Sequence, residues 1–440
     1  MSGGDDFAGR TLHFVGIGGA GMSGLALIAH ELGAEVTGSD QVASSYTERL
    51  RERGIPIAVG HAAEHVPAGA ELVYSTAVPA SNPERVAAAE RQLHRSELLA
   101  QIAALRRTIA ITGTHGKTTT AAMVVHTLRG CGFDPAYVIG GELRATGLNA
   151  EWGRGEWIVI EADESDRSLL NLWPEVAVLT NAELDHHSTY GSQRDLEATL
   201  REFMARARSA AVVWNRPELR ALCPPGAIPY DAADPLLEPG GSRFTWRGHE
   251  VVLSVPGAHN AINGAGALEA AVLAGADPAG AVVALRDFSG ARRRLERLGQ
   301  TRSGADVFDD YAHHPTEVAA AIEAARTFSP RRLVAVFQPH LYSRTAALAR
   351  AFGVALGTAD IAAVLDVYPA RERTDDFPGV DGRAVASAAA EEAGGRQVAW
   401  LPRFADARAF LEVTLRSGDL CLLMGAGNID ALGRSLVCSG

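Results

Sequence analysis

The sequence predicts an α/β protein built from parallel sheets. Short apolar runs alternate with Ala-, Leu-, Glu- and Arg-rich stretches that favour helices. Two of the apolar runs lead directly into glycine-rich turns, as strands do in nucleotide-binding folds. Hydrophobic residues make up 47% of the chain and charged residues 21%, which suits ordinary globular cores. The expected strands are Thr11–Val15, Glu35–Thr37, Thr108–Ile111, Trp157–Ile160, Val176–Leu179, Leu333–Phe337 and Ile361–Asp366.

The length of 440 residues exceeds what one hydrophobic core usually supports, so we expect three domains. Polar and glycine-bearing breaks near residues 105–107 and 298–304 divide the chain into residues 1–106, 107–298 and 299–440. The segment Arg243–Val255 departs from the α/β pattern, because its aromatic and β-branched residues lie near glycine-bearing turns. It predicts a small antiparallel element.

Charge and composition exclude several classes of protein. The net charge is −11, and the only basic cluster is the short run Arg292–Arg294, which argues against a general nucleic-acid surface. The N-terminus lacks the pattern of a signal peptide, and no apolar run approaches the roughly 18 residues of a membrane span. We therefore expect a soluble, cytoplasmic protein. The four cysteines form no C-x-x-C pair and suit reduced thiols: Cys131, Cys223, Cys421 and Cys438.

A phosphate-binding loop lies between the expected strand Thr108–Ile111 and a helix-like segment, Thr120–Leu128. Its spacing is G-T-x-G-K-T-T rather than the common G-x-x-x-x-G-K-[ST], because Ile111 occupies the position of the first glycine. Backbone N–H groups and the helix N-terminus can cradle phosphates, while Lys117 reaches the terminal phosphates and Thr118 holds magnesium. The loop therefore predicts a nucleoside triphosphate, bound by Gly113, Thr114, His115, Gly116, Lys117, Thr118 and Thr119.

A second glycine-rich turn follows the first expected strand. Its glycines, which allow a tight turn and close approach to a diphosphate, are Gly16, Gly18, Gly19 and Gly21. Asp40 lies nineteen residues beyond Gly21, at the end of the second strand, where it can accept a hydrogen bond from a sugar hydroxyl. The motif alone leaves three interpretations open: an NAD site, a site for another nucleotide diphosphate, or a scaffold without a ligand.

Two polar clusters follow strands of the middle block. Glu161 ends the strand Trp157–Ile160 and begins an acidic run, Glu161–Asp166, whose carboxylates can hold magnesium beside a triphosphate. His186 lies in the run that follows Val176–Leu179, and it can be a metal ligand or a phosphate donor. Each cluster by itself also fits a solvated loop. Their position at the same sheet edge as the phosphate loop favours a site.

A series of ordered blocks makes the chain similar to the Mur ligases over essentially its full length. The resemblance is closest to those members that join L-alanine to UDP-N-acetylmuramate. The matching blocks are GIGGAGMSG (16–24), GSD (38–40), GTHGKTT (113–119), EADESD (161–166), HNxxN (259–263), RR (293–294), DDYAHHPTEV (309–318), FQPHLYSRT (337–345), DVYPARE (366–372) and MGAGNI (424–429).

This resemblance implies a Rossmann-like UDP-sugar-binding domain at 1–106, a P-loop-type ATP-binding domain with a parallel sheet at 107–298, and a Rossmann-like domain for the amino acid at 299–440. It implies that the lactyl carboxylate of UDP-N-acetylmuramate attacks ATP to form an acyl phosphate, which L-alanine then attacks. The expected cofactors are ATP and Mg²⁺, and the expected partners are these small molecules. The glycine-rich N-terminal turn then binds UDP rather than NAD.

The same resemblance assigns roles to single residues. It implies catalytic roles for Lys117, Glu161, His186, Arg294 and Asp310. Thr118, Glu161 and His186 correspond to metal ligands, and Asn260, Asn263, Arg294 and Asp310 to nucleotide-binding residues. The substrate-binding positions are Gly16, Gly18, Gly19, Gly21, Ser39 and Asp40 for the UDP-sugar, and Tyr311, His313, His340 and Arg344 for L-alanine.

Two positions depart from the family pattern. Leu341 stands where some members carry arginine, so the expected carboxylate contact rests on Arg344, and Ser188 replaces the second aspartate of D-H-x-D-x-Y. Two alternatives to L-alanine addition stay open. One is a murein peptide ligase, which attaches a recycled tripeptide to the same UDP-sugar. The other is a catalytically silent nucleotide-binding homologue with the same fold.

Overall fold

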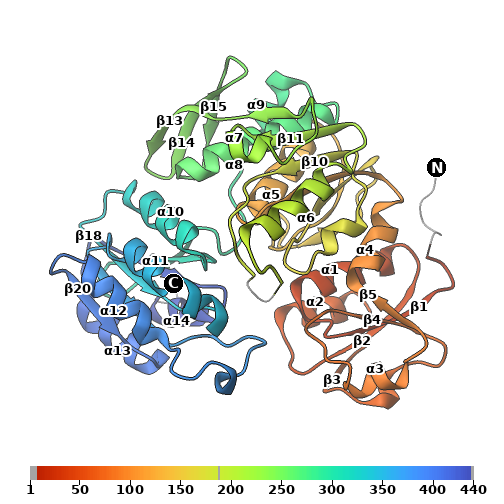
Figure 1. Cartoon of the computed structure of the whole chain (residues 1–440), viewed down its shortest axis with the longest axis horizontal. Helices are drawn as coiled ribbons and strands as arrows, with labels where there is room; N and C mark the ends of the chain where they lie inside the picture. Colours follow the sequence, from red (N-terminus) through yellow and green to blue (C-terminus); the bar gives the residue numbers. More distant parts are fainter. Residues whose placement is uncertain (1–6, 187–188, 438–440) are drawn as a thin grey trace. The chain divides into compact units, whose positions relative to one another are not determined.

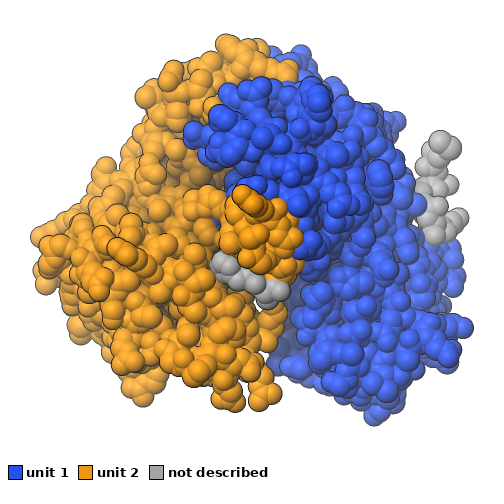
Figure 2. Space-filling view, viewed as in Figure 1, with its two compact units in different colours: residues 1–182, 196–230, 266–284 blue, residues 183–195, 231–265, 285–440 orange. Residues whose placement is uncertain are grey.

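The computed structural model describes residues 7–186 and 189–437 as alternating strands and helices, and this confirms the predicted α/β class (Figure 1). The strands form four sheets of five, seven, three and six strands. The chain falls into two compact units, coloured separately in Figure 2. Unit 1 comprises residues 1–182, 196–230 and 266–284 and contains the sheets of five and seven strands. Unit 2 comprises residues 183–195, 231–265 and 285–440 and contains the other two.

The five-stranded sheet is parallel throughout. Its elements are β1 (Thr11–Val15), α1 (Ala20–Glu31), β2 (Glu35–Asp40), α2 (Ser45–Glu52), β3 (Ile57–Val59), η1 (Ala63–His65), β4 (Glu71–Tyr74), α3 (Pro83–Ala87), β5 (Gln92–His94) and α4 (Arg95–Ala103). The strand order β3-β2-β1-β4-β5 is Rossmann-like. The chain adds strands on one side of β1 up to β3 and then continues with β4 on its other side. Folds of this kind bind ligands at the carboxyl end of β1, where the glycine-rich turn lies.

A buried carboxylate ties several segments of this sheet together. The side chain of Glu84 on α3 is fully buried and accepts hydrogen bonds from Ser39 Oγ at 2.6 Å and Ala62 N at 3.1 Å. His13 Nε2 and His65 Nδ1 lie 3.2 and 3.1 Å from its oxygens. Burial opposes ionisation, but the hydrogen bonds from His13, Ser39, Ala62 and His65 lower the pKa of Glu84 to about 2. The carboxylate is therefore ionised and joins β1, β2 and η1 to α3.

The seven-stranded sheet has the order β12-β11-β10-β6-β9-β7-β8 and is parallel except for the pair β7 and β8. Its elements are β6 (Arg107–Thr112), α5 (Lys117–Gly130), β7 (Ala136–Val138), β8 (Ala150–Glu151), β9 (Trp157–Glu161), η2 (Ser168–Asn171), β10 (Val176–Leu179), α6 (Gln193–Met204), β11 (Ala210–Trp214), α7 (Pro217–Arg220) and β12 (Ile228–Tyr230). Because β6 lies between β9 and β10, the loops that follow these three strands meet at one edge.

The helix after the phosphate loop is longer than predicted. It begins at Lys117 rather than Thr120 and ends at Gly130. Gly116 adopts a left-handed conformation with φ 77° and caps the helix, so the chain turns from the loop into the helix within one residue. Lys117 and Thr118 therefore stand in the first helical turn.

A small antiparallel sheet confirms the element predicted in the middle of the chain. It has the order β13-β14-β15, with β13 (Ala233–Glu238), β14 (Gly241–Trp246) and β15 (His249–Leu253). The edge strand β13 was not predicted. It contains Pro235 and a register shift between Ala233 and Leu236, features that sequence patterns assign to loops. Two helices follow, α8 (Ala258–Leu273) and α9 (Pro278–Leu285).

The six-stranded sheet has the order β16-β17-β21-β18-β19-β20 and is parallel except for its edge strand β16. Its elements are β16 (Glu296–Gln300), β17 (Asp306–Asp310), α10 (Pro315–Arg326), β18 (Arg332–Phe337), α11 (Tyr342–Leu356), β19 (Ile361–Val364), η3 (Thr374–Asp376), α12 (Gly382–Glu392), β20 (Gln397–Trp400), α13 (Phe404–Thr414), β21 (Asp419–Met424) and α14 (Ile429–Leu436). The predicted strand Ile361–Asp366 was too long at its end. Asp366 instead accepts the backbone N–H of Gly382, at the start of α12, at 2.9 Å.

Helices cover both faces of this sheet. Alternate residues of β18 enter two separate cores: Leu333 and Phe337 pack in the core that includes Phe352 of α11, whereas Val334 packs in the core that includes Leu411 of α13. This alternation is what a parallel strand buried on both faces requires. The C-terminal sheet is therefore doubly wound, as the Rossmann-like prediction required.

None of the helices within the described ranges combines the length and hydrophobicity that a membrane span needs. Cys131, Cys223 and Cys421 are free thiols, as expected, and Cys438 lies outside the described residues.

Replacing Glu84 by glutamine should lower the free energy of unfolding by about 2 to 3 kcal/mol at pH 7, because hydrogen bonds to a buried charged group are lost. The pKa of Glu84 falls from 4.5 to about 2 on folding, so its stabilisation is complete above pH 4.5 and is lost as the pH falls toward 2. Urea denaturation measures the free energy of unfolding of Glu84→Gln and wild type at pH 7 and pH 4. The difference between the two proteins should be smaller at pH 4 than at pH 7. The exposed Glu90→Gln is the control, and equal stability of Glu84→Gln and wild type at pH 7 would contradict the prediction.

Candidate active site

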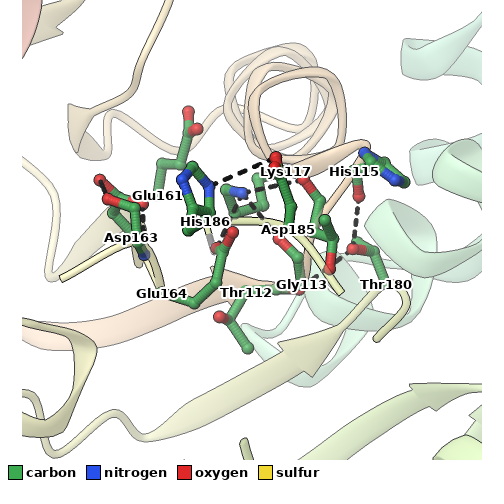
Figure 3. A network of polar contacts seen from close by, with 12 residues as sticks. Thr112, Gly113, His115, Lys117, Glu161, Asp163, Glu164, Thr180, Asp185 and His186 are labelled. Atoms are coloured by element: carbon green, nitrogen blue, oxygen red, sulfur yellow. Dashed lines mark hydrogen bonds and ion pairs between the residues drawn. The ribbon is translucent and has the colours of Figure 1, made fainter. Parts of the chain in front are cut away.

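The predicted phosphate loop lies between β6 and α5, at the carboxyl edge of the central sheet (Figure 3). Gly113 has a φ of 126°, and a Cβ atom there would lie 2.8 Å from the backbone nitrogen of Asn181. Only glycine fits this position, and Gly116 has the positive φ that starts the helix. The loop therefore places the N-terminus of α5 at the sheet edge, where backbone N–H groups bind anions.

The end of β10 fixes the backbone of the loop. Thr180 Oγ1 donates to the carbonyl of His115 at 2.6 Å, and the side chain of Asn181 both donates to that carbonyl and accepts from the N–H of His115, each at 2.9 Å. The side chain of His115 is buried. Thr119 is also buried, in the first turn of α5. Residues that follow the neighbouring strand β10 thus fix the backbone conformation of the loop through these hydrogen bonds.

Lys117 is the only lysine in the 440-residue sequence. Its Nζ donates to the carbonyl oxygens of Gly113 at 2.7 Å and Thr114 at 3.2 Å, and it forms an ion pair with Glu164 at 2.8 Å (Figure 3). Burial alone would lower the pKa of Lys117, but the carboxylates of Glu164, Asp163 and Glu161 raise it above its ordinary value. A permanent positive charge therefore lies beneath the loop.

The two predicted metal ligands of this unit lie together. Thr118 Oγ1 donates to the carboxylate of Glu161, with distances of 2.8 and 3.0 Å to its two oxygens, and the N–H of Gly140 donates to Glu161 at 2.6 Å. A hydroxyl and a carboxylate are hard oxygen donors of the kind Mg²⁺ prefers. The helix start and the end of β9 thus provide a pair of oxygen ligands beside Lys117.

The rest of the acidic run is held by an arginine of the N-terminal sheet. Arg95 at the start of α4 forms ion pairs with Asp163 at 3.3 Å and Asp166 at 3.0 Å. These contacts raise the pKa of Arg95 despite its burial. Of the acidic residues that follow β9, Glu164 pairs with Lys117 and the two aspartates bind Arg95, which orders the run.

The glycine-rich N-terminal turn is held from β2. Asp40 Oδ2 accepts the backbone N–H of Gly18 at 2.8 Å, and a Cβ atom on Gly18 would lie 2.9 Å from this oxygen. Gly16 has a φ of 74°, Gly19 caps α1, and Gly21 is in its first turn. The structure therefore places Asp40 in contact with the turn itself, where it supports the backbone.

Ser39 lies inside the domain. Its side chain is fully buried, and its hydroxyl contacts Glu84 at 2.6 Å and His61 Nδ1 at 2.9 Å, while its carbonyl accepts from the backbone of Gly16 and Ile17. The hydroxyl is committed to these internal partners. The contribution of Ser39 to the turn is thus positional.

Asp310 and Arg294 lie close together in unit 2. Asp310 ends β17, and its carboxylate accepts the backbone N–H groups of Leu295 at 2.7 Å and Ala312 at 2.8 Å. Burial raises its pKa. The guanidinium of Arg294 lies over the ring of Tyr311, 5.4 Å from the ring centre. The carboxylate thus fixes the backbone directly after Arg294 and directly after Tyr311.

The two predicted asparagines are on α8. Asn260 donates to the carbonyl of Pro256 at 2.7 Å, which ties the first turn of the helix to the segment before it, and Asn263 is buried one turn further on. His259 precedes them, and burial together with the nearby charge of Arg294 lowers its pKa to about 4. His259 is therefore neutral near pH 7.

Three of the residues predicted for the amino-acid site, Tyr311, His313 and His340, lie in a group of aromatic rings that also includes Tyr368. His313 packs edge-on against Tyr311 at 5.4 Å and against His340 at 6.2 Å, and His340 stacks on Tyr368 at 5.8 Å. Burial is the main cause that lowers the pKa of His313 to about 4 and that of His340 to about 3. Both imidazoles are therefore neutral at physiological pH, and the predicted residues Tyr311, His313 and His340 do lie side by side.

Arg344, the fourth residue predicted for the amino-acid site, forms a buried ion pair with Asp185. Its Nε and Nη2 atoms donate to the two carboxylate oxygens of Asp185 at 2.8 and 2.9 Å, and both side chains are 3% exposed. Burial alone would raise the pKa of Asp185, but the charge of Arg344 lowers it below its ordinary range. His186 follows, with Nε2 3.6 Å from Asp185 Oδ2. Leu341 is buried at the start of α11, whereas Ser188 lies outside the described residues.

Sequence reasoning missed the partners of the two key cations. Glu164 stands in the predicted acidic run, and Asp185 directly precedes the predicted ligand His186, but neither was predicted to pair with a cation. Both could have been suspected, because a buried lysine or arginine needs a counter-charge and each carboxylate lies in a motif already singled out. Which carboxylate pairs with which cation depends on contacts between segments distant in sequence.

Three domain families match the chain. The Mur ligase family, catalytic domain, matches residues 11–107, the Mur ligase middle domain matches residues 111–223, and the Mur ligase, glutamate ligase domain, matches residues 293–427. Together these matches cover most of the sequence, including the glycine-rich turn, the phosphate loop and the C-terminal sheet.

Individual proteins agree with these matches. The UDP-N-acetylmuramate--L-alanine ligases of Mycobacterium sp. (strain JLS) and Rubrobacter xylanophilus are each 42% identical to the chain. The match with the Mycobacterium protein spans 98% of this chain and 95% of that protein. The match with the Rubrobacter protein spans 97% of this chain and 99% of that protein. The crystal structure of the UDP-N-acetylmuramate-alanine ligase of Thermotoga maritima superposes with a TM-score of 0.83 at 27% identity, covering 97% of this chain and 98% of that one. A murein peptide ligase from Psychrobacter arcticus shares the fold, with a TM-score of 0.72 at 23% identity and the same coverage. The chain belongs to the Mur ligase family.

Proposed function

We propose that this protein is an ATP-dependent ligase that joins L-alanine to the lactyl carboxylate of UDP-N-acetylmuramate in peptidoglycan precursor synthesis. The relatives that are 42% identical over nearly the whole chain carry this activity in their names. The observation that carries the chemistry is the group of Lys117, Thr118 and Glu161 at the phosphate loop. We place the reaction in the cytoplasm, where nucleotide-linked wall precursors and ATP are available, and connect it to cell shape and division through the wall.

The reaction has two steps. A carboxylate oxygen of UDP-N-acetylmuramate attacks the γ-phosphorus of ATP, and ADP leaves with the electron pair of the broken P–O bond. The amine of L-alanine then attacks the acyl carbon, phosphate departs, and a proton is released from the nitrogen. Activation is needed because a carboxylate does not react with an amine until its oxygen becomes a good leaving group. Catalysis is mainly positioning and neutralisation of phosphate charge.

Lys117 supplies that neutralisation. Its Nζ lies beneath the loop that cradles the phosphates, and its raised pKa keeps it charged. Arg294 and Asp310 act from the C-terminal part of the chain on the same nucleotide, and Asn260 and Asn263 belong to its pocket.

Magnesium fits the residues that are present. Thr118 and Glu161 provide two hard oxygen ligands within hydrogen-bond distance of each other. His186, which the resemblance implies as a third ligand, belongs to unit 2. When bound, Mg²⁺ supplies charge that stabilises the transferred phosphoryl group. In the protein itself, the N–H of Gly140 orients the Glu161 carboxylate, and the helix start orients the Thr118 hydroxyl.

The UDP-sugar belongs to the N-terminal sheet. Gly16, Gly18, Gly19 and Gly21 form the turn that approaches the diphosphate, and Ser39 and Asp40 hold this turn. We propose the corresponding division into a UDP-sugar-binding domain at 1–106, an ATP-binding domain at 107–298 and an amino-acid-binding domain at 299–440. The separate five-stranded and seven-stranded sheets support the first boundary, whereas β16 (Glu296–Gln300) of the six-stranded sheet begins just before the second.

L-alanine occupies the pocket of Tyr311, His313, His340 and Arg344. Two neutral imidazoles and a guanidinium suit a small amino acid that carries a carboxylate and a reactive amine. Addition of a recycled tripeptide has less support, since the murein peptide ligase shares only the fold. A catalytically silent homologue is disfavoured because Lys117, Glu161, His186 and Asp310 are all present.

ADP should form steadily only when UDP-N-acetylmuramate and L-alanine are both present with ATP and Mg²⁺. The acyl phosphate forms only on a bound carboxylate and is consumed only by an amine. A coupled assay of ADP release, with each component omitted in turn, measures this. Steady ADP production without L-alanine would contradict the proposed sequence of steps.

Among amino acids, L-alanine should react with the highest kcat/KM, and glycine and L-serine should be weaker substrates. One methyl group in a pocket discriminates by only about 1 to 3 kcal/mol, so the preference over glycine should be about 10- to 200-fold. The measurement is kcat/KM for each amino acid and for the L-alanyl-γ-D-glutamyl-meso-diaminopimelate tripeptide. A preference for the tripeptide would transfer the assignment to the recycling ligase.

Lys117→Ala should lower kcat by at least about 1,000-fold, since the variant loses the charge that neutralises the transferred phosphoryl group. Its affinity for UDP-N-acetylmuramate, measured by calorimetry, should stay within twofold of wild type, because the UDP site is on another sheet. Arg154→Ala removes a cation that is 98% exposed from the same unit and is the control. If Lys117→Ala lost affinity for the UDP-sugar, the proposed division between the two sites would be wrong.

A further inference from the structure

The guanidinium of Arg344 is almost fully committed to neighbours within unit 2. Nε and Nη2 each donate to an oxygen of Asp185, and Nη1 contacts Nδ1 and the carbonyl of His340 at 3.1 and 3.2 Å. A guanidinium has five N–H donors. Four of them therefore have partners among the described residues, and one N–H on Nη2 does not.

The aspartate that binds Arg344 is itself anchored by a neighbouring contact. Two residues before it, Glu183 accepts a hydrogen bond from Thr316 Oγ1 at 2.5 Å, and Glu183 also lies 3.7 Å from His314 Nδ1. Thr316 and His314 stand at the start of α10, while Arg344 is on α11. The segment that carries Asp185 is thus attached to two helices of the C-terminal sheet, and Asp185 cannot move freely away from the arginine.

The imidazole rings beside this pair add no charge to it, while the carboxylate of Glu317 lies 3.2 Å from His313 Nδ1. His340 is neutral and contacts Arg344 through a ring nitrogen, and His313 beside it is neutral as well. Asp185 is the carboxylate in direct contact with the guanidinium, and both side chains are buried to the same extent. If the aspartate were absent, Arg344 would keep its contacts with His340 but would be a buried cation without a counter-charge, and its guanidinium would no longer be held at Nε and Nη2.

We propose that Asp185 is a positioning residue of the amino-acid site. It holds Arg344 so that a single N–H group remains for the α-carboxylate of the substrate, which is then bound through one oxygen rather than as a two-point clamp. This inference rests on the proposed function, because it takes Arg344 as the carboxylate-binding residue. It also explains how the site works with Leu341 where some family members have a second arginine.

Asp185→Asn tests the proposal, because asparagine keeps the shape of the side chain but removes the charge and replaces one acceptor by a donor. Steady-state kinetics should show KM for L-alanine raised at least tenfold, with KM for ATP and for UDP-N-acetylmuramate within twofold of wild type. The matched control is Asp419→Asn. Asp419 forms a similar two-point pair with Arg332 in the same sheet, with 3.0 Å from Nε to Oδ1, but at the amino ends of β18 and β21. The Asp419→Asn variant should have a lower free energy of unfolding than wild type but an unchanged KM for L-alanine.

The outcomes separate this inference from the proposed function. Wild-type protein that does not use L-alanine would reject the proposed function itself. If wild type is active and Asp185→Asn has an unchanged KM for L-alanine, only the role of Asp185 is rejected. A lowered KM would also overturn it, since Asp185 would then compete with the substrate. A change confined to the Mg²⁺ concentration that the enzyme requires would also overturn the proposal, since Asp185 would then act in metal binding together with His186. Should Asp185→Asn fail to fold, Asp185→Glu, which keeps the charge but moves the carboxylate by one methylene group and so disturbs the two-point pair, must raise KM for L-alanine, and an unchanged KM would overturn the proposal.

Discussion

One buried ammonium group holds the central site together. Lys117 joins the carbonyl oxygens of its own loop to Glu164, in the run that follows β9. Carboxylates at a buried sheet edge are costly unless a cation neutralises them, and a buried cation is costly without carboxylates. Each therefore makes the other possible. The turn at Gly113, whose positive φ suits glycine, and the order of strands β9-β6-β10 are the conditions that let the two meet.

The same arrangement recurs in the C-terminal sheet, where cations are fixed by carboxylates beyond the ends of parallel strands. Arg293 binds Asp309 at 3.0 Å and also donates to the carbonyl of Gly425, while Arg344 binds Asp185. The interior of the six-stranded sheet is apolar and its strands alternate between two cores. Ligands of such sheets bind at the carboxyl ends of the strands, and the residues to which the resemblance assigns roles follow strand ends of this kind.

Local patterns predicted much of this, and long-range pairing did not follow from them. Strands β1 and β10 have the bounds that their apolar runs predicted, and the phosphate loop was evident from glycine and lysine spacing. The edge strand β13 was not predicted because Pro235 and a bulge interrupt the residue pattern typical of a strand. The inward direction of Ser39 depends on Glu84, which is 45 residues away in the sequence, and the partner of Arg344 is 159 residues away. No local periodicity reports such pairings.

The single lysine of the chain has a chemical consequence for a ligase of the proposed kind. An acyl phosphate acylates neutral amines and leaves ammonium ions unchanged, so any deprotonated ε-amine near the intermediate would compete with the amino acid. This protein has forty arginines, whose guanidinium groups stay protonated, and one lysine, whose pKa is raised by three carboxylates. The enzyme therefore carries no side-chain amine that its own activated intermediate could modify at neutral pH.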